Sequence, residues 1–344
     1  MAELNASATK LHKDEKALEM FTEMLIEKIS SIQNDWKKPW FTEGCLGAAR
    51  NLSGREYNGM NQLLLSMMAE KNGWEVPIYA TFDRVKKLNF DSKGKHIEGE
   101  EVHVMKGEKS IPVFITTFTC VHRETKEKIP YESWREMPQD RREEYNVFPR
   151  LNVYSVFNIS QTNIKDTRPE LYAKLVPSKE EHVPTDDFCF EPMDRMIEEN
   201  LWECPIKPTY GDDAYYSISK DEIVVPEKKQ FKDGESFYSN LFHEMAHSTG
   251  SEKRLNRLKP ASFGSKEYAR EELVAELTAA VSASHFGMQK HVKDDSIAYL
   301  KSWLESLKEE PKFLKTILND VKRASHMIIR HCEDVKFNEN KKTA

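Results

Sequence analysis

The sequence has few cysteines, and they form no ligand or redox motif. Five cysteines are scattered over 344 residues without a C-x-x-C pair. An odd number of dispersed cysteines argues against a disulfide framework, and the missing C-x-x-C pair argues against a zinc site built on cysteine. Histidine and carboxylate side chains are therefore the remaining candidates for metal ligands.

Long apolar runs and an excess of basic residues are also missing. No apolar stretch approaches the ~18 residues needed to cross a bilayer, and the N-terminal segment lacks the apolar centre of a signal peptide. We therefore expect a soluble, cytoplasmic protein without a membrane partner. The net charge is −6. This charge excludes a wholly basic nucleic-acid binder, so any contact with DNA requires a local patch.

The first half of the sequence combines helical and strand-like patterns. Helical spacing of apolar residues predicts three helices, at residues 13–33, 60–71 and 81–90. Runs rich in β-branched and aromatic residues predict three strands, at residues 101–105, 111–121 and 151–159. The charged stretch 123–145 is expected to be an exposed excursion from the sheet. These patterns indicate an α+β domain with an antiparallel sheet.

The second half has a different pattern. A β-hairpin is predicted at 213–226, and from residue 234 onward the chain is almost entirely helical. A polar stretch with three prolines separates the halves. We therefore predict an α+β protein with two domains, residues 1–165 and 188–344, joined by a linker at 166–187. The second domain is expected to be mostly helical, with a small antiparallel sheet.

Residues 239–250 read SNLFHEMAHSTG and contain an H-E-x-x-H motif. A helix places His243 and His247 on one face, about 5–6 Å apart at Cβ. Two such imidazoles can bind one zinc ion, and Glu244 can act as the general base. The alternative is that three polar residues fell together by chance. Apolar neighbours favour a buried helix, in which histidines need partners, and Gly250 is expected to end it.

A hydrolytic zinc site needs a third protein ligand. Lys253 occupies the position of the third histidine in H-E-x-x-H-x-x-G-x-x-H, so that pattern is excluded. Glu272 and Glu276 share one face of a predicted helix at 268–283. We assign Glu272 as the third ligand and Glu276 as a carboxylate that orients a ligand imidazole. Glu271 points about 100° away and is the weaker candidate. The alternative is a solvated, glutamate-rich helix face.

Residues 36–62 interleave aromatic, basic and amide side chains. Aromatic rings that stack on bases, together with cations that contact phosphates, are typical of single-stranded nucleic-acid binding. Tryptophans near a helix end also serve as core anchors, so the pattern alone leaves both interpretations open. Further basic residues could extend the track, namely Arg84, Lys86, Lys87, Lys106 and Lys109.

The ordered set of motifs resembles the ArdC-type antirestriction proteins of conjugative elements. In the first half the resemblance rests on WKKPW (36–40), NLSGREYNGMNQLLL (51–65), KGEK (106–109) and VFNISQT (156–162). In the second half it rests on FHEMAHSTG (242–250), YAREELVAEL (268–277) and AYLKSWLESLK (298–308). Two features depart from the family pattern: the long stretch 123–145, and Ser251, where relatives often carry a histidine.

The resemblance implies an N-terminal domain that binds single-stranded DNA and a zincin-like metallopeptidase domain. It also implies protection of incoming DNA from restriction, and metal binding by His243, His247 and Glu272. The residues for which it implies DNA binding are Trp36, Trp40, Asn51, Arg55, Tyr57 and Asn61. From the basic residues we add Lys38, within 36–62, and Lys106, from the possible extension of the track, as candidates.

Three functions remain open on the sequence alone. The leading hypothesis is a single-stranded-DNA-binding protein with a gluzincin-like, metal-dependent peptidase site, in which the metal is Zn²⁺ or alternatively Mn²⁺. The EIVVP strand (222–226) would then align a protein or peptide substrate by edge pairing. Tyr215, Tyr216 and Tyr268 are candidates for oxyanion stabilisation. The alternatives are a DNA-binding module with a non-catalytic metal site and a cytosolic metalloprotease without a DNA role.

Overall fold

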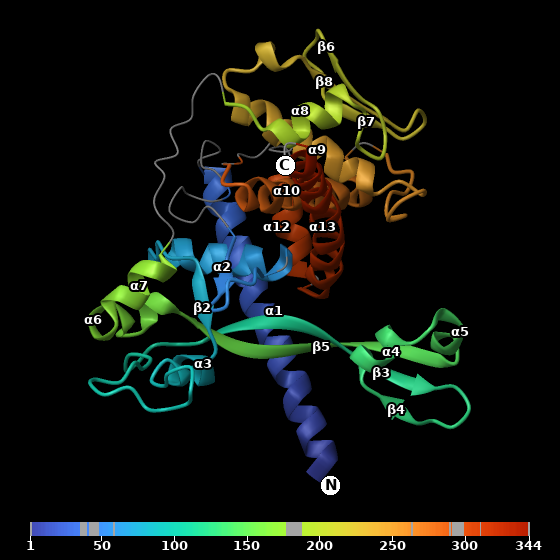
Figure 1. Ribbon diagram of the computed structural model, residues 1–344. Coiled ribbons are helices and arrows are strands. Elements are labelled where there is room, and N and C mark those ends of the chain that lie inside the picture. Colours follow the sequence, from blue (N-terminus) through green and yellow to red (C-terminus); the bar gives the residue numbers. More distant parts are fainter. Residues whose placement is uncertain are drawn as a thin grey trace.

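The computed structural model describes residues 2–34, 40, 48–57, 59–176, 188–262, 264–288, 290, 299–309 and 311–342. Within these ranges the chain is a mixed α+β protein with two sheets (Figure 1). None of the helices in the described ranges is long and apolar enough to span a membrane.

The larger sheet belongs to the N-terminal region and has the strand order β1-β2-β5-β3-β4. Its strands are β1 (Arg50–Asn51), β2 (Ile78–Ala80), β3 (Ile111–His122), β4 (Lys128–Ile129) and β5 (Tyr145–Asn158). All neighbouring strands are antiparallel except β1 and β2, which are parallel. The helices of this region are α1 (Ala2–Asn34), α2 (Gly59–Asn72) and α3 (Phe82–Lys87). The three predicted helices and the strands at 111–121 and 151–159 are confirmed.

Strands β3 and β5 form a long two-stranded ribbon (Figure 1). The near end of the ribbon packs against α1 and α2. The far end carries the charged stretch 123–145, which folds as β4 followed by α4 (Tyr131–Glu136) and α5 (Gln139–Arg142). The strand predicted at 101–105 is wrong. Only Val104 forms a β-bridge, with Thr162, because no neighbouring strand pairs with the rest of the run.

The start of the expected linker 166–187 is helical. A short 3₁₀ turn η2 (Ile159–Gln161) leads into α6 (Ile164–Thr167) and α7 (Pro169–Leu175). Leu171, Tyr172 and Leu175 pack onto a small apolar cluster that includes Val76, Val85 and Val102. Residues 166–176 are therefore part of the N-terminal region. Residues 177–187 lie outside the described residues.

The second sheet has three strands, in the order β6-β8-β7. The predicted hairpin is confirmed as β7 (Tyr215–Ser217) and β8 (Glu222–Pro226), and β6 (Ile206–Thr209) adds to β8 in parallel. The other elements of this half are α8 (Glu191–Glu198), η3 (Lys228–Gln230), α9 (Gly234–Thr249), α10 (Lys266–His285), α12 (Leu300–Glu309) and α13 (Pro311–Lys342).

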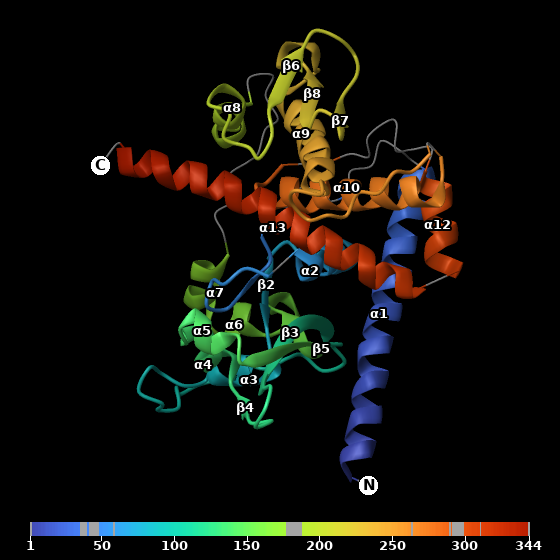
Figure 2. The same ribbon diagram turned by 90° about the vertical axis from the view of Figure 1, so that its right-hand side faces the viewer.

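The largest apolar core is shared by the two halves of the chain. It includes Phe21, Leu25 and Leu64 from α1 and α2, together with Leu277 from α10 and Leu318 from α13. Helix α13 crosses the molecule between the two regions and contacts helices of both (Figure 2). A second core, around α9 and the small sheet, supports the H-E-x-x-H motif.

Candidate metal centre

Helix α9 carries the H-E-x-x-H motif. It begins after Asp233, whose carboxylate accepts the backbone N–H of Ser236 at 2.6 Å, and it ends at Gly250 as expected. Gly250 has an ordinary φ of −77°, so the glycine is not required by a left-handed turn. A Cβ at this position would lie 2.7 Å from Leu258 Cγ, so the close approach of the next loop requires the glycine.

Three side chains from two helices converge at the centre of this region. His243 and His247 come from α9, and Glu272 comes from α10. The two Nε2 atoms are 3.1 Å apart, and they lie 3.4 Å and 3.5 Å from oxygens of Glu272. Ligands of a tetrahedral zinc site, with bonds of about 2.0–2.1 Å, stand roughly 3.3 Å from one another. The arrangement therefore fits a divalent metal ion.

A carboxylate faces the remaining nitrogen of each imidazole. Glu276 Oε1 lies 3.3 Å from Nδ1 of His243, and Glu271 Oε1 lies 3.2 Å from Nδ1 of His247. Arg257 binds Glu271 through two hydrogen bonds of 2.8 Å. Such partners keep the proton on Nδ1 and leave Nε2 for the metal. The position of Glu276 follows from helix periodicity, whereas the contact of Glu271 with His247 does not, because it depends on the loop that carries Arg257.

Glu276 is held by two further buried side chains. Its Oε2 accepts hydrogen bonds from the indole N–H of Trp40 at 3.3 Å and from Nζ of Lys290 at 3.1 Å. The backbone N–H of Trp40 donates to the carbonyl of Lys290 at 2.7 Å. The side chains of Lys290 and Glu276 are 3% and 0% exposed, so the ion pair is sheltered from water. Trp40 therefore links the N-terminal region to the metal centre.

Without a metal, His243 and the carboxylates around it stabilise one another as charged groups. Burial disfavours the charged form of His243, but Glu272 and Glu276 outweigh it and raise the pKa of His243 to about 9. Burial also acts against the ionised form of Glu272, but His247 and His243 lower its pKa to about 2. A metal ion must displace the proton from His243 Nε2. The three ligand side chains are therefore already in position, but His243 must lose a proton before it can bind the ion.

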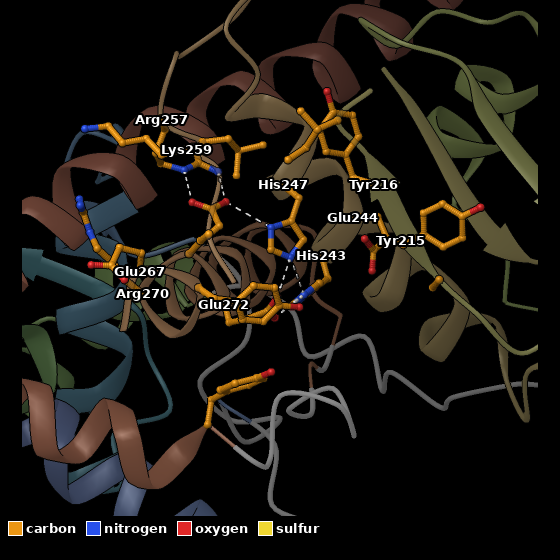
Figure 3. A pocket seen from close by; sticks show the side chains of 17 residues that line it. Tyr215, Tyr216, His243, Glu244, His247, Arg257, Lys259, Glu267, Arg270 and Glu272 are labelled. Carbon is orange, nitrogen blue, oxygen red and sulfur yellow. Dashed lines mark hydrogen bonds and ion pairs between the residues drawn. The ribbon is translucent and has the colours of Figure 1, made fainter. Parts of the chain in front are cut away.

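The three residues line a cavity of about 550 Å³ that also contains Glu244 and tyrosines from β7 and α10 (Figure 3). The hydroxyl of Tyr216 donates to Asp221 at 2.6 Å and accepts from Arg254 at 3.0 Å, so it is already engaged. Burial and the charge of Glu272 raise the pKa of the Tyr268 hydroxyl, which lies beside that carboxylate. Tyr215 is 46% exposed at the rim.

The expected role of the EIVVP strand is wrong. This segment is β8, which is the central strand of the small sheet and pairs with β6 on one side and β7 on the other. Its backbone groups are therefore used within the sheet. Strand β7 is one of the two edge strands, and Tyr215 and Tyr216 of that strand line the cavity.

Two of the residues predicted to contact DNA are buried. Trp40 is 0% exposed and its ring packs in the shared core, so it is a core anchor and cannot stack on a base. Asn61 is 3% exposed, and its amide bonds both backbone groups of Phe114, at 2.7 Å and 2.8 Å. For these two residues the structure supports the core interpretation.

The remaining candidates for DNA contact are spread over different environments. Asn51 Oδ1 accepts the backbone N–H groups of Ser53 and Arg55 and so shapes a turn. Tyr57 is half-buried, edge-to-face with Tyr79. Arg55 and Lys106 are exposed, and Trp36 and Lys38 lie outside the described residues. The described members of the set therefore form no continuous stacking surface.

Comparison with known proteins assigns both halves of the chain. Residues 15–157 match the N-terminal domain of anti-restriction factor ArdC, and residues 193–317 match a zincin-like metallopeptidase domain, MPTase-PolyVal. The fold and the site thus define a two-domain protein that combines an ArdC N-terminal domain with a zincin-like domain. In this organisation the chain resembles ArdC-type antirestriction proteins.

Solved structures and curated proteins share this organisation. ArdC from the R388 plasmid has a TM-score of 0.61 in its metal-free form and 0.63 in its Mn(II)-bound form, at 22% and 23% identity. These matches cover 91% and 92% of this chain and 98% and 97% of the ArdC chains. Protein y4eC of Sinorhizobium fredii is 26% identical and covers 93% of this chain and 94% of its own length. DNA primase TraC of Escherichia coli is 27% identical over 85% of this chain, which spans only 25% of the primase.

Proposed function

We propose that this protein is an antirestriction-type single-stranded-DNA-binding protein with a metal-dependent peptidase site, and that it acts in the cytoplasm on DNA arriving by conjugative transfer. The observation that carries the enzymatic part is the convergence of His243, His247 and Glu272 beside Glu244 in one cavity. The ArdC N-terminal domain supports the DNA-binding part. The similarity to part of a DNA primase supports it further.

In this proposal His243, His247 and Glu272 hold the metal. The donor set of two imidazoles and one carboxylate is typical of zinc peptidases, and the Mn(II)-bound ArdC structure makes Mn²⁺ the alternative. When bound, the ion supplies Lewis-acid polarisation of a water molecule and of the substrate carbonyl. Metal content and activity after loading with each ion separately would identify the native metal.

The side chains around the metal ligands have separate tasks. Glu244 accepts a proton from the attacking water and delivers it to the leaving amine, as a general base and then a general acid. Glu276 and Glu271 fix the two imidazoles so that both Nε2 atoms face the same point. Tyr268, whose hydroxyl donates a hydrogen bond to Glu272, holds this ligand carboxylate in place at the cavity wall. The substrate is a protein or peptide chain lying along the cavity.

Glu244→Gln tests the enzymatic part. This variant keeps the metal ligands, so we expect metal content to stay at the wild-type level while peptide cleavage falls by about 10²–10⁴-fold. The assay is mass-spectrometric detection of cleavage in a mixed peptide library. If the metal-loaded wild type cleaves nothing and Glu244→Gln protects incoming DNA as well as wild type, the site is non-catalytic.

Single-stranded-DNA binding is tested separately. We expect binding of single-stranded oligonucleotides to weaken steeply as salt rises, because phosphate contacts release counterions. Fluorescence anisotropy over a salt series measures this dependence. A protein that cleaves peptides but shows no salt-dependent binding would instead be a cytosolic metalloprotease without a DNA role.

A further inference from the structure

Helix α3 and the loop after it form a basic surface on a protein of negative net charge. Residues 81–95 contain five lysines and arginines and two aspartates, whereas the whole chain carries a net charge of −6. All five cations are exposed. We refer to these cations together with Phe82 and Phe90 as the α3 surface.

The cations of the α3 surface are not used inside the fold. Among the described residues, none of Arg84, Lys86, Lys87, Lys93 and Lys95 forms a side-chain ion pair with an acidic group. The nearby carboxylate of Asp91 instead accepts the backbone N–H groups of Lys93 and Lys95, at 2.9 Å and 2.8 Å. The positive charges therefore remain available for an external anion.

Two aromatic rings lie among these cations. Phe82 and Phe90 are each 47% exposed. Nζ of Lys86 lies 4.9 Å from the centre of the Phe82 ring. The ring of Phe90 stands edge-to-face with His96 at 5.4 Å. Both rings thus present part of their surface to solvent, and Phe82 does so beside a lysine.

The backbone beneath the α3 surface is firmly built. The hydroxyl of Thr81 caps α3 by accepting the N–H of Arg84, and Val85 anchors the helix in an apolar cluster. The amide of Asn89 is buried and forms two hydrogen bonds with the backbone of Val102. The backbone that carries these side chains is therefore held in one conformation, which lowers the entropic cost of binding.

We propose that the α3 surface is the binding site for single-stranded DNA, with bases stacked on Phe82 and Phe90 and phosphates bound by the cations. Exposed aromatics beside unpaired cations are the combination that single strands require. Duplex DNA hides its base faces, and an acidic peptide would not need the rings. The site rests on the proposed DNA-binding function and replaces Trp40 and Asn61, which are buried.

The position of the surface separates DNA from the metal centre. Both views place α3 at the opposite end of the molecule from α9 and α10 (Figures 1 and 2). DNA held on the α3 surface is therefore not presented to the cavity beside Glu244. This separation agrees with a metal centre that acts on a peptide rather than on the bound strand.

The test compares variants of the full-length protein that change the α3 surface with a control variant that removes the same number of charges elsewhere. The variant Arg84→Gln/Lys86→Gln/Lys87→Gln changes three exposed side chains of α3, and Phe82→Ala removes one ring. The matched control is Lys220→Gln/Lys229→Gln/Lys232→Gln, which changes three side chains that are 70%, 75% and 79% exposed in the other half. Each protein is titrated onto a fluorescent oligothymidylate of about 20 nucleotides and onto its duplex with oligodeoxyadenylate, over a salt series.

We expect the α3 triple variant to lose tenfold or more of its affinity for the single strand. Its slope of log affinity against log salt should be shallower by about 2, because roughly 0.7 is lost per phosphate contact. Phe82→Ala should lose about tenfold without changing the slope, and the control should bind like wild type. Binding by wild type with no effect of the α3 changes, or preference for the duplex, would overturn the location. No binding by wild type would also remove the proposed DNA-binding function.

Discussion

Glu276→Gln should weaken metal binding although Glu276 is not a ligand. The carboxylate faces Nδ1 of His243 at 3.3 Å and is the partner that fixes this imidazole. A glutamine amide can keep the contact but carries no charge, so the imidazole becomes a poorer donor. Loss of such partners typically costs 10–100-fold in metal affinity, so we expect a drop of about that size. Competition with a chromophoric chelator, for Zn²⁺ and for Mn²⁺, measures it.

The same substitution leaves the buried ammonium of Lys290 without its carboxylate partner. Breaking a buried ion pair from one side costs about 3–5 kcal/mol, so the metal-free variant should be less stable. Lys290→Met should be destabilised in the same way, because it leaves Glu276 charged and buried. The double variant Glu276→Gln/Lys290→Met removes both charges and should recover most of the stability, as measured by chemical denaturation.

Metal affinity and stability should therefore separate in this set of variants. The double variant is expected to recover stability but not metal affinity, because the carboxylate that faces His243 is still missing. Glu305→Gln, an exposed change on α12 away from the cavity, is the control for both measurements. Wild-type metal affinity in Glu276→Gln would refute the role of this carboxylate. Recovery of affinity in the double variant would show that the single change acted only through stability.

Four further predictions follow from the geometry. Glu272→Ala should lose the metal in elemental analysis, whereas Glu271→Ala should keep most of it; the reverse result would exchange their roles. Asp221, whose pKa is lowered mainly by the guanidinium of Arg254, stabilises the fold above its unfolded pKa of about 3.9. That contribution is lost as pH falls further, so acid unfolding should shift less with pH in Asp221→Asn. Gly250→Ala should lower the free energy of unfolding by about 1–3 kcal/mol, because its Cβ would meet the next loop at 2.7 Å. A fragment of residues 188–344 should unfold at lower denaturant than the full chain, because it lacks the α1 and α2 side of the shared core.

The parts that sequence analysis anticipated are those set by local periodicity. The spacing of His243 and His247 within α9, and of Glu272 and Glu276 within α10, follows from 3.6 residues per turn, so the shared faces could be predicted. The segments that form β3 and β5 could also be predicted as strands, because they are rich in β-branched and aromatic residues. The run 101–105 (EVHVM) also contains strand-forming valines but finds no partner strand, and pairing is not encoded in the run itself.

The parts that were missed depend on contacts between distant segments. Trp40 and Glu276 are separated by 236 positions in the sequence. A tryptophan beside lysines is typical of both a stacking platform and a core anchor, and only the packed structure distinguishes them. The contact of Arg257 with Glu271 could not be predicted from the sequence, because it depends on how the loop after α9 folds back onto α10. The α3 surface also depends on the packed structure, because only there is it seen that its cations form no ion pair with an acidic group of the described residues.

The network around Glu276 couples metal binding in the C-terminal region to the packing of the N-terminal region. Trp40, from the N-terminal region, and Lys290, from the C-terminal region, bind the same carboxylate oxygen. That carboxylate in turn faces the imidazole of His243. Metal binding that favours this arrangement must therefore also favour the docked position of Trp40, because coupling between two sites is reciprocal. The ion then stabilises the junction between the halves as well as the cavity, so metal removal should loosen the contact with the N-terminal region.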